Sequence, residues 1–103
     1  MPEKPNGSAA TRPGVKWEYK FDPAAVRDLR AVGPSVAREI RAFLDKRILG
    51  ASDPRQFGKP LRGAKHGLWR YRVQDYRVIC RIEDAVVTVV VVAIGHRSTV
   101  YGE

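Results

Sequence analysis

The sequence predicts an α+β fold in which a small, antiparallel-rich β-sheet has a helical hairpin packed on one face. Three observations predict it: the elements follow in the order strand, helix, helix, strand, strand, strand; both helices carry one apolar stripe; and the stretch WRYRVQDYRVICRIED alternates around a two-residue turn. With 103 residues, the chain has room for one domain. We expect this domain to span residues 15–103. Residues 1–14 are rich in turn formers, and we expect them to form a flexible N-terminal tail.

The first three elements are marked by alternation and by helix-end signals. Residues 15–21 alternate as a strand does, with aromatic side chains on one face. Asp22 and Pro23 then provide an N-cap and a first-turn proline, and Gly33 ends the first helix. The second helix follows and ends at Gly50. Its buried stripe is expected to consist of Val36, Ile40, Phe43, Leu44 and Ile48.

The second half of the chain is predicted to supply most of the sheet. Residues 50–67 contain turn formers and basic residues without periodicity, so this long segment is either pinned to the body by Phe57 and Leu61 or functional. Two strands joined at a Gln-Asp turn follow it. The last strand, residues 85–94, is apolar on both faces and is therefore expected to be central in the sheet.

The predicted hairpin brings like charges together. If its loop has two residues, Arg72 lies directly across from Arg77, and like charges facing each other destabilise a sheet. Trp69 and Tyr71 point the other way, towards the helix-packed face. Arg70 therefore joins Arg72 and Arg77 on the open face of the sheet. An anionic ligand would relieve the repulsion, so this pairing indicates a binding function.

Composition narrows the class of protein. The 19 Lys and Arg residues exceed the 11 Asp and Glu residues and give a net charge of +8, which favours nucleic acid or an acidic protein as the partner. The longest apolar run, residues 85–94, is about half of the roughly 20 residues that a membrane helix needs. No secretory signal is visible, and the single cysteine, Cys80, cannot form an internal disulfide. The expected location is the cytoplasm, without membrane association.

Several common catalytic sites lack their residues. The sequence has no Gly-rich phosphate loop, no CxxC pair and no HExxH motif, and its carboxylates do not converge, so we expect neither a metal nor a cofactor. Ser98 near His96 does not make a triad. Guanidinium groups do converge, because Arg97 follows the last strand and joins the hairpin arginines. Such a cluster suits a phosphodiester, with Tyr101 or His96 left to move protons.

The quoted stretch also carries a family resemblance. The run KPLRGAKHGLWRYRVQDYRVICRIED, followed by a valine-rich strand and GHRSTVY, resembles the RelE branch of the RelE/ParE toxins of bacterial toxin–antitoxin pairs. The resemblance covers residues 15–103 in unbroken element order. It implies a small antiparallel sheet backed by two helices, and an activity that cleaves messenger RNA in the ribosomal decoding site. It also implies a metal-independent reaction, in which the ribose 2′-hydroxyl attacks the adjacent phosphate.

The resemblance implies roles for particular residues. The two basic residues of the first hairpin strand fall on Arg70 and Arg72, and the arginine after the turn falls on Arg77. The arginine after the final strand is Arg97, and the terminal tyrosine is Tyr101. These five are the expected catalytic residues, with charge stabilisation by Arg77 and Arg97 and with Tyr101 stacking on a base or taking the proton. The expected RNA-binding residues are Arg62, Lys65 and His96.

One departure from the family leaves the general base open. The best-studied relatives have lysines where this chain has Arg70 and Arg72, and arginine is a poor base because its pKa is above about 12. Tyr101, with a pKa lowered by neighbouring cations, is one candidate and His96 is another. The implied partners are a RelB-like antitoxin in a hetero-oligomer, the ribosome and messenger RNA. The alternative is a ParE-like toxin that binds DNA gyrase without nuclease chemistry, and a third possibility is a relative without activity.

Overall fold

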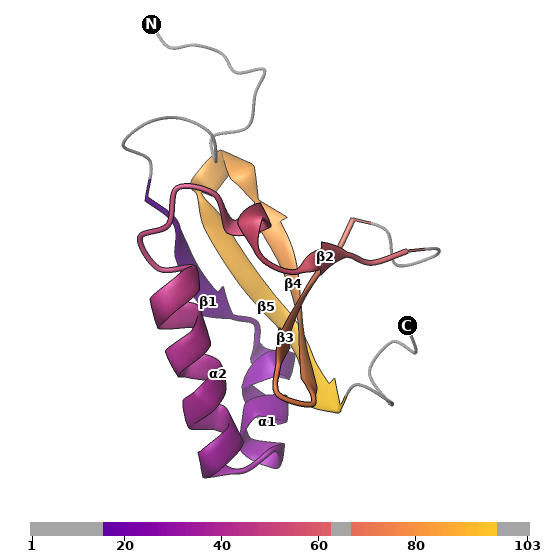
Figure 1. Ribbon diagram of the computed structural model, residues 1–103. Coiled ribbons are helices and arrows are strands. Elements are labelled where there is room, and N and C mark those ends of the chain that lie inside the picture. Colours follow the sequence, from indigo (N-terminus) through magenta and orange to yellow (C-terminus); the bar gives the residue numbers. More distant parts are fainter. Residues whose placement is uncertain (1–15, 63–66, 97–103) are drawn as a thin grey trace, which may run out of the picture.

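Two helices cover one face of a five-stranded sheet in the computed structural model, which describes residues 16–62 and 67–96 (Figure 1). The elements are β1 (Glu18–Phe21), α1 (Pro23–Ala31), α2 (Pro34–Arg47), β2 (Lys59–Pro60), β3 (Trp69–Val73), β4 (Tyr76–Glu83) and β5 (Thr88–His96), with 3-10 turns at Pro54–Gln56 and Asp84–Val86. The predicted α+β class and the order of its elements are confirmed.

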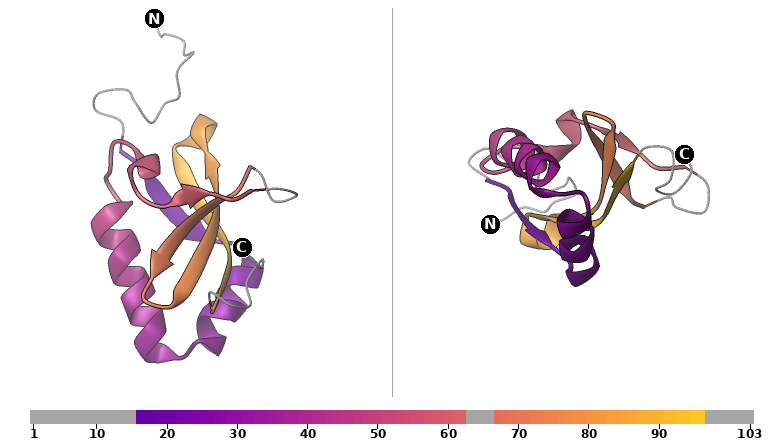
Figure 2. Two further views of the ribbon diagram at one scale, coloured as in Figure 1. Left: turned by 45° about the vertical axis from the view of Figure 1, so that its right-hand side comes forward. Right: turned by 90° about the horizontal axis from the view of Figure 1, so that it is seen from below.

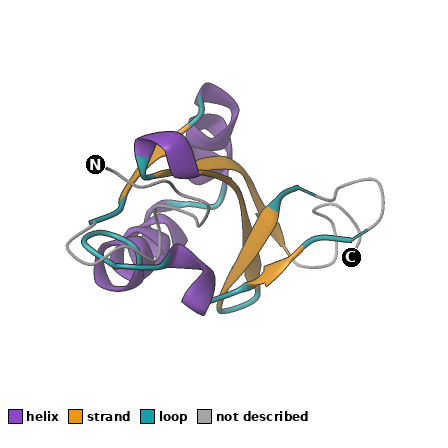
Figure 3. Ribbon diagram, turned by 90° about the horizontal axis from the view of Figure 1, so that it is seen from above, coloured by secondary structure: helices purple, strands orange, loops and turns teal. Residues whose placement is uncertain are grey.

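The sheet is mixed, with the strand order β1-β5-β4-β3-β2. The neighbours β2–β3, β3–β4 and β4–β5 are antiparallel, whereas β1 lies parallel to β5. The long strand β5 therefore has a partner on each side, which confirms its expected central position. The sheet is twisted and curved, and both helices lie on one side of it (Figures 2 and 3).

The first helix begins at its predicted signal, whereas α2 ends at Arg47, three residues before the predicted Gly50. The Asp22 carboxylate accepts a hydrogen bond from the Ala24 N–H at 3.2 Å, and Pro23 occupies the first turn of α1. Gly33, with a φ of 93°, separates the two helices. Neither helix of the described residues has the length and apolarity needed to cross a bilayer.

One hydrophobic core fills the space between the helices and the sheet. The fully buried Trp17 lies directly before β1, and α2 contributes its predicted stripe. Asp28 of α1 accepts a hydrogen bond from the Ile94 N–H at 2.9 Å, beyond the last residue pair of β1 with β5. The buried core residues are Trp17, Ala25, Leu29, Ile40, Leu44, Ile48, Tyr71, Val73, Val78, Cys80, Val89, Val91 and Ile94.

The long segment before β3 is pinned to the body of the protein. Phe57 packs against the core and Leu61 is buried, as predicted. Two side chains of β3 add hydrogen bonds: the Trp69 Nε1–H donates to the Phe57 carbonyl oxygen at 2.7 Å, and the Tyr71 hydroxyl donates to the Pro54 carbonyl oxygen at 2.8 Å. These bonds hold the segment against the sheet, so most of its described length is structural.

The structure differs from the predicted fold in three details. The first strand starts at Glu18 rather than at residue 15, and its pairing is parallel. The short edge strand β2 was not predicted. The final strand starts at Thr88, because the residues before it form a 3-10 turn that ends in the left-handed Val87, with a φ of 50°. The predicted tail, residues 1–14, lies outside the described residues.

Burial of the Cys80 thiol predicts alkaline destabilisation. Burial raises the pKa of this thiol above its ordinary value of 9.0, so the folded protein keeps a proton that the unfolded chain releases. Above about pH 9 the unfolded state binds fewer protons, and the free energy of unfolding should fall by up to about 1.4 kcal/mol per pH unit. Denaturant titrations of Cys80→Ala should lack this slope between about pH 9 and 10. Equal slopes in both proteins would contradict the assignment.

Candidate functional site

The three hairpin arginines lie on the sheet face opposite the helices, which we call the arginine face. In the β3–β4 register Arg72 is paired with Arg77, and Arg70 is paired with Ile79. Directly opposed side chains have Cβ atoms about 4.5–5.5 Å apart, so Arg72 and Arg77 are immediate neighbours. The predicted juxtaposition of like charges is therefore present. It sits beside the turn, where Gln74 has a φ of 56°.

The arginines differ in exposure along this face. Arg72 is exposed and forms no ion pair with any residue of the described segments, whereas Arg70 and Arg77 are half-buried. The Nε atoms of both half-buried residues are shielded from solvent. Partial burial lowers the local dielectric, which strengthens the attraction of a guanidinium for a phosphate oxygen.

Other arginines near the sheet are neutralised by carboxylates. Arg81, further along β4 on the same face, has its Nε 2.7 Å from a Glu83 oxygen. Arg55 binds Asp84 in a bidentate manner, with both N–O distances at 3.0 Å, and the hydrogen bond to Asp84 raises the pKa of Arg55. The second pair links the segment before β2 to the β4–β5 connection. Of the hairpin arginines, Arg72 beside the β3–β4 turn forms no ion pair with a described residue.

The arginine face is not simply polar. Ile79 is 0% exposed, Val90 is 4% exposed and Leu61 is 4% exposed, and all three lie outside the main core. By register, Ile79 and Val90 point to the same side of the sheet as the arginines. The sequence predicted an open, solvated face. Instead, buried apolar side chains lie between the arginines on this face, and we call Ile79 and Val90 its apolar floor.

His96 lies on the other side of the sheet. It is paired with Tyr76 in the β4–β5 register, and the two rings meet edge to face with centroids 5.7 Å apart. Gly95, one residue earlier, is the position opposite Arg77. Successive residues of a strand point to opposite faces, so the imidazole does not share the arginine face. The structure therefore does not bring His96 to the hairpin arginines.

Two other tyrosines are structural groups. Burial and a hydrogen bond donated to Asp45 at 2.5 Å raise the pKa of Tyr19 to about 12. Burial also raises the pKa of Tyr71, whose hydroxyl is bonded to Pro54. Both phenols keep their protons at neutral pH, so neither is suited to accept a proton from a substrate.

Several predicted site residues lie outside the described residues: Arg97, Tyr101 and Lys65. Arg62 is described and exposed, one residue beyond the buried Leu61. Within residues 16–62 and 67–96, no group of three His, Cys, Asp or Glu side chains is placed to hold a metal ion. Of the predicted cluster, the structure therefore brings together Arg70, Arg72 and Arg77.

Sequence reasoning missed a further cation on the arginine face. Lys59, in the two-residue strand β2, is paired with Arg70 and is exposed. A strand this short has no periodicity to detect, and Pro60 argues against a strand. The turn-forming Gly58 directly before it was the one available signal.

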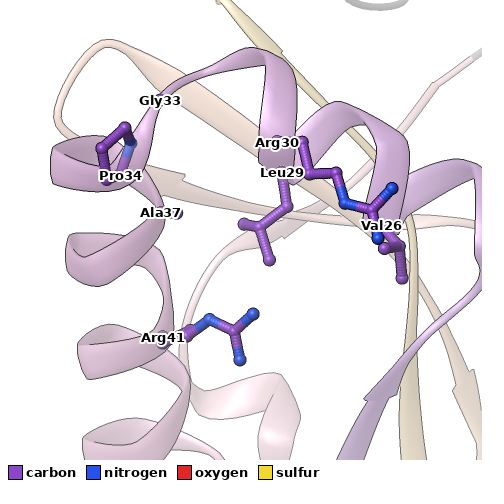
Figure 4. A pocket seen from close by; sticks show the side chains of 7 residues that line it. All are labelled: Val26, Leu29, Arg30, Gly33, Pro34, Ala37 and Arg41. Carbon is purple, nitrogen blue, oxygen red and sulfur yellow. The ribbon is translucent and has the colours of Figure 1, made fainter.

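A hollow lies on the helix side of the molecule. A groove of about 430 Å³ separates α1 from α2, and Val26, Leu29 and Ala37 give it apolar walls. Figure 4 shows Arg41 reaching from α2 towards α1, with Arg30 on the opposite side. Neither guanidinium forms an ion pair with a residue in the described segments. An apolar groove flanked by cations is suited to an acidic, amphipathic partner.

Comparison with known proteins identifies the family. The model of the ParE toxin of type II toxin–antitoxin systems (parDE) matches residues 19–101. The chain belongs to the RelE/ParE toxin family. Toxin RelG of Mycobacterium tuberculosis is 32% identical to this toxin over 87 residues, which cover 84% of this chain and 98% of RelG. Toxin RelE of the same organism is 35% identical over 77 residues, which cover 75% of this chain and 77% of that toxin.

Solved structures of RelE proteins share the fold of this toxin. The M. tuberculosis RelBE2 toxin–antitoxin complex contains a chain with 31% identity and a TM-score of 0.69, and the match covers 82% of this toxin and 95% of that chain. The isolated Escherichia coli RelE toxin has 26% identity and a TM-score of 0.63, and the match covers 82% and 90% of the two chains. The recognised family and the α+β fold are thus both confirmed.

Proposed function

We propose that this toxin is a ribosome-dependent endoribonuclease that cleaves messenger RNA and thereby inhibits translation. The observation that carries the proposal is the Arg72–Arg77 pair, in which two arginines are directly opposed on one face of the sheet, beside the buried Ile79. A protein gains nothing in stability from such a pair, whereas a bound phosphodiester would turn the repulsion into two charge-assisted contacts. The similarity to RelE and RelG toxins supports the same function.

The proposed reaction needs charge stabilisation above all. The ribose 2′-oxygen forms a bond to phosphorus while the bond to the 5′-oxygen breaks, leaving a 2′,3′-cyclic phosphate and a 5′-hydroxyl. Negative charge grows on the phosphoryl oxygens in the transition state, and Arg72 and Arg77 are placed to bind it. We assign the proton from the 2′-hydroxyl to the phenolate form of Tyr101, since His96 lies on the other face, and the departing 5′-oxygen takes its proton from water. Arg97 is assigned to the same charge stabilisation on the basis of the family resemblance alone.

Two measurements test the proposal against the gyrase alternative. The family model carries the ParE name, so a toxin that binds DNA gyrase is the second candidate function. After brief induction, primer extension should map discrete cuts in translated messengers, naked RNA should be cut hardly at all, and a supercoiling assay should show active gyrase. Intact messengers together with inhibited gyrase would overturn the nuclease in favour of the second candidate.

An antitoxin is the proposed partner in the cytoplasm, where the ribosomes work. The RelBE2 match is a toxin–antitoxin complex, and the groove between α1 and α2 fits an acidic, amphipathic helix. Reversing both charges with Arg30→Glu and Arg41→Glu should weaken antitoxin binding by about tenfold or more, measured by calorimetry on purified proteins. Arg38→Glu, exposed on α2 outside the groove, is the control. Equal affinities for the double variant and the control would rule out this groove.

A further inference from the structure

The strand β2 extends the arginine face by one cation. Lys59 and Arg70 are paired across β2 and β3, and opposed residues of an antiparallel pair point to the same side. Lys59 is exposed and forms no ion pair with a residue of the described segments. The ammonium group is therefore available to a ligand that lies along this face.

The backbone that carries Lys59 is held in place on both sides. Before it, Gly58 has a φ of 76°, and a Cβ at this position would stand 2.2 Å from the Arg70 carbonyl oxygen, so the two strands are in close contact. The Trp69 indole anchors the preceding Phe57 carbonyl at 2.7 Å. After it, the N–H of the buried Leu61 donates to the Leu68 carbonyl oxygen at 3.0 Å. Lys59 is thus presented at a defined position rather than from a loose loop.

The cations form a track that runs away from the turn. Neighbouring strands are about 4.8 Å apart and residues two apart along a strand are about 6.8 Å apart, so Lys59 and Arg70 form one step and Arg72 and Arg77 form the next. Glu83 at the end of β4 is bound by Arg81, and Asp84 in the 3-10 turn that follows is bound by Arg55. A polyanion crossing the strands would meet positive charge at both steps.

We infer that Lys59 and Arg70 form a second phosphate subsite, which binds the RNA backbone next to the phosphate at Arg72 and Arg77. The inference rests on the proposed function for RNA as the ligand. A lysine suits this task, because its flexible point charge can follow a backbone phosphate without the bidentate geometry that the reacting phosphate requires. The subsite binds and positions RNA and takes no part in proton transfer.

Salt-dependent RNA binding tests the subsite. The probe is a single-stranded RNA oligomer, 2′-O-methylated throughout so that it cannot be cleaved, titrated against the purified full-length toxin by fluorescence anisotropy. Loss of one phosphate contact should reduce the slope of log K against log salt by about 0.7 for Lys59→Gln. Affinity at low salt should fall roughly threefold to tenfold. Lys59→Arg should keep both values close to those of the unmodified toxin.

The matched control is Lys46→Gln, which removes an equal charge from the exposed surface of α2, on the helix side of the sheet. Its slope should equal that of the unmodified toxin. Equal slopes for Lys59→Gln and Lys46→Gln would overturn the subsite, as would an unmodified toxin that shows no salt-dependent binding. Neither result bears on messenger cleavage. Conversely, the toxin could leave translated messengers intact while Lys59→Gln still changes the slope. That result would contradict the proposed function but support the anion subsite.

Discussion

Replacing Arg77 by alanine should reduce cleavage of translated messenger RNA by about 10²- to 10³-fold and abolish growth arrest. Arg77 is half-buried and directly opposite Arg72, and its Nε is shielded from solvent. A guanidinium in such surroundings stabilises a phosphoryl transition state more strongly than an exposed one, because the local dielectric is lower. The rate should be measured on ribosomes that carry one defined messenger.

Arg81→Ala is the matched control for this experiment. Arg81 lies on the same strand and the same face, but its charge is already bound to Glu83, so its loss should leave cleavage almost unchanged. Antitoxin binding should also survive in Arg77→Ala, since the proposed groove is on the helix side. Because Arg77 is half-buried, the denaturation midpoints of both variants should be compared. A stable Arg77→Ala protein with full toxicity would remove this residue from the catalytic site.

Gly58→Ala should be strongly destabilising, costing about 3–5 kcal/mol of the free energy of unfolding. Two effects combine here. The φ of 76° is costly for a residue with a Cβ, and that Cβ would stand 2.2 Å from a backbone oxygen of β3 and 2.8 Å from the Trp69 Nε1. A backbone atom cannot swing aside, so β2 must move. Against a total stability of about 5–15 kcal/mol, this loss is large.

Gly50→Ala separates the two effects. Gly50 has a similar φ of 78°, but a Cβ there would meet nothing within 4 Å. Only the backbone strain applies, and the expected cost is about 1–2 kcal/mol. Denaturant unfolding of the two variants measures the difference. Equal losses would show that β2 is not held tightly against β3.

Local signals in the sequence were enough to predict much of this fold. Asp22 and Pro23 mark the start of α1, and their cap is present. Strict alternation around the two-residue turn was enough to place Arg72 opposite Arg77. These features depend on residues that are close together in the chain. The residue preferences of helix ends and the alternation of side chains along a strand are informative about such features.

Features that depend on distant neighbours were not predictable. Nothing in residues 15–21 shows whether β1 pairs parallel or antiparallel with β5, because pairing direction is decided by the path of the helices between them. Between β4 and β5, Ile79 is paired with Ala93 but Cys80 is paired with Val91, so β5 has one extra residue, Val92. This bulge changes which valines face the helices. It cannot be detected in the sequence, because a run of valines has no alternation that an extra residue would interrupt.

The candidate site shows the same division. Adjacency to Arg97 in the sequence suggested that His96 belongs with the arginines, yet alternation along β5 places it on the opposite face, against Tyr76. Lys59 was missed because a two-residue strand carries no pattern. The apolar floor was missed because burial of Ile79 depends on how the sheet is covered and not on its own strand.

The most direct test of the account uses a messenger with a single 2′-deoxyribose at the mapped cleavage position, bound to ribosomes and incubated with the toxin. We predict that this one missing oxygen abolishes cleavage there, while the all-ribose messenger yields a 2′,3′-cyclic phosphate and a 5′-hydroxyl. Cleavage of the 2′-deoxy messenger at an unchanged rate, or a product with a 5′-phosphate, would contradict the claim that the arginine face stabilises 2′-hydroxyl attack on RNA.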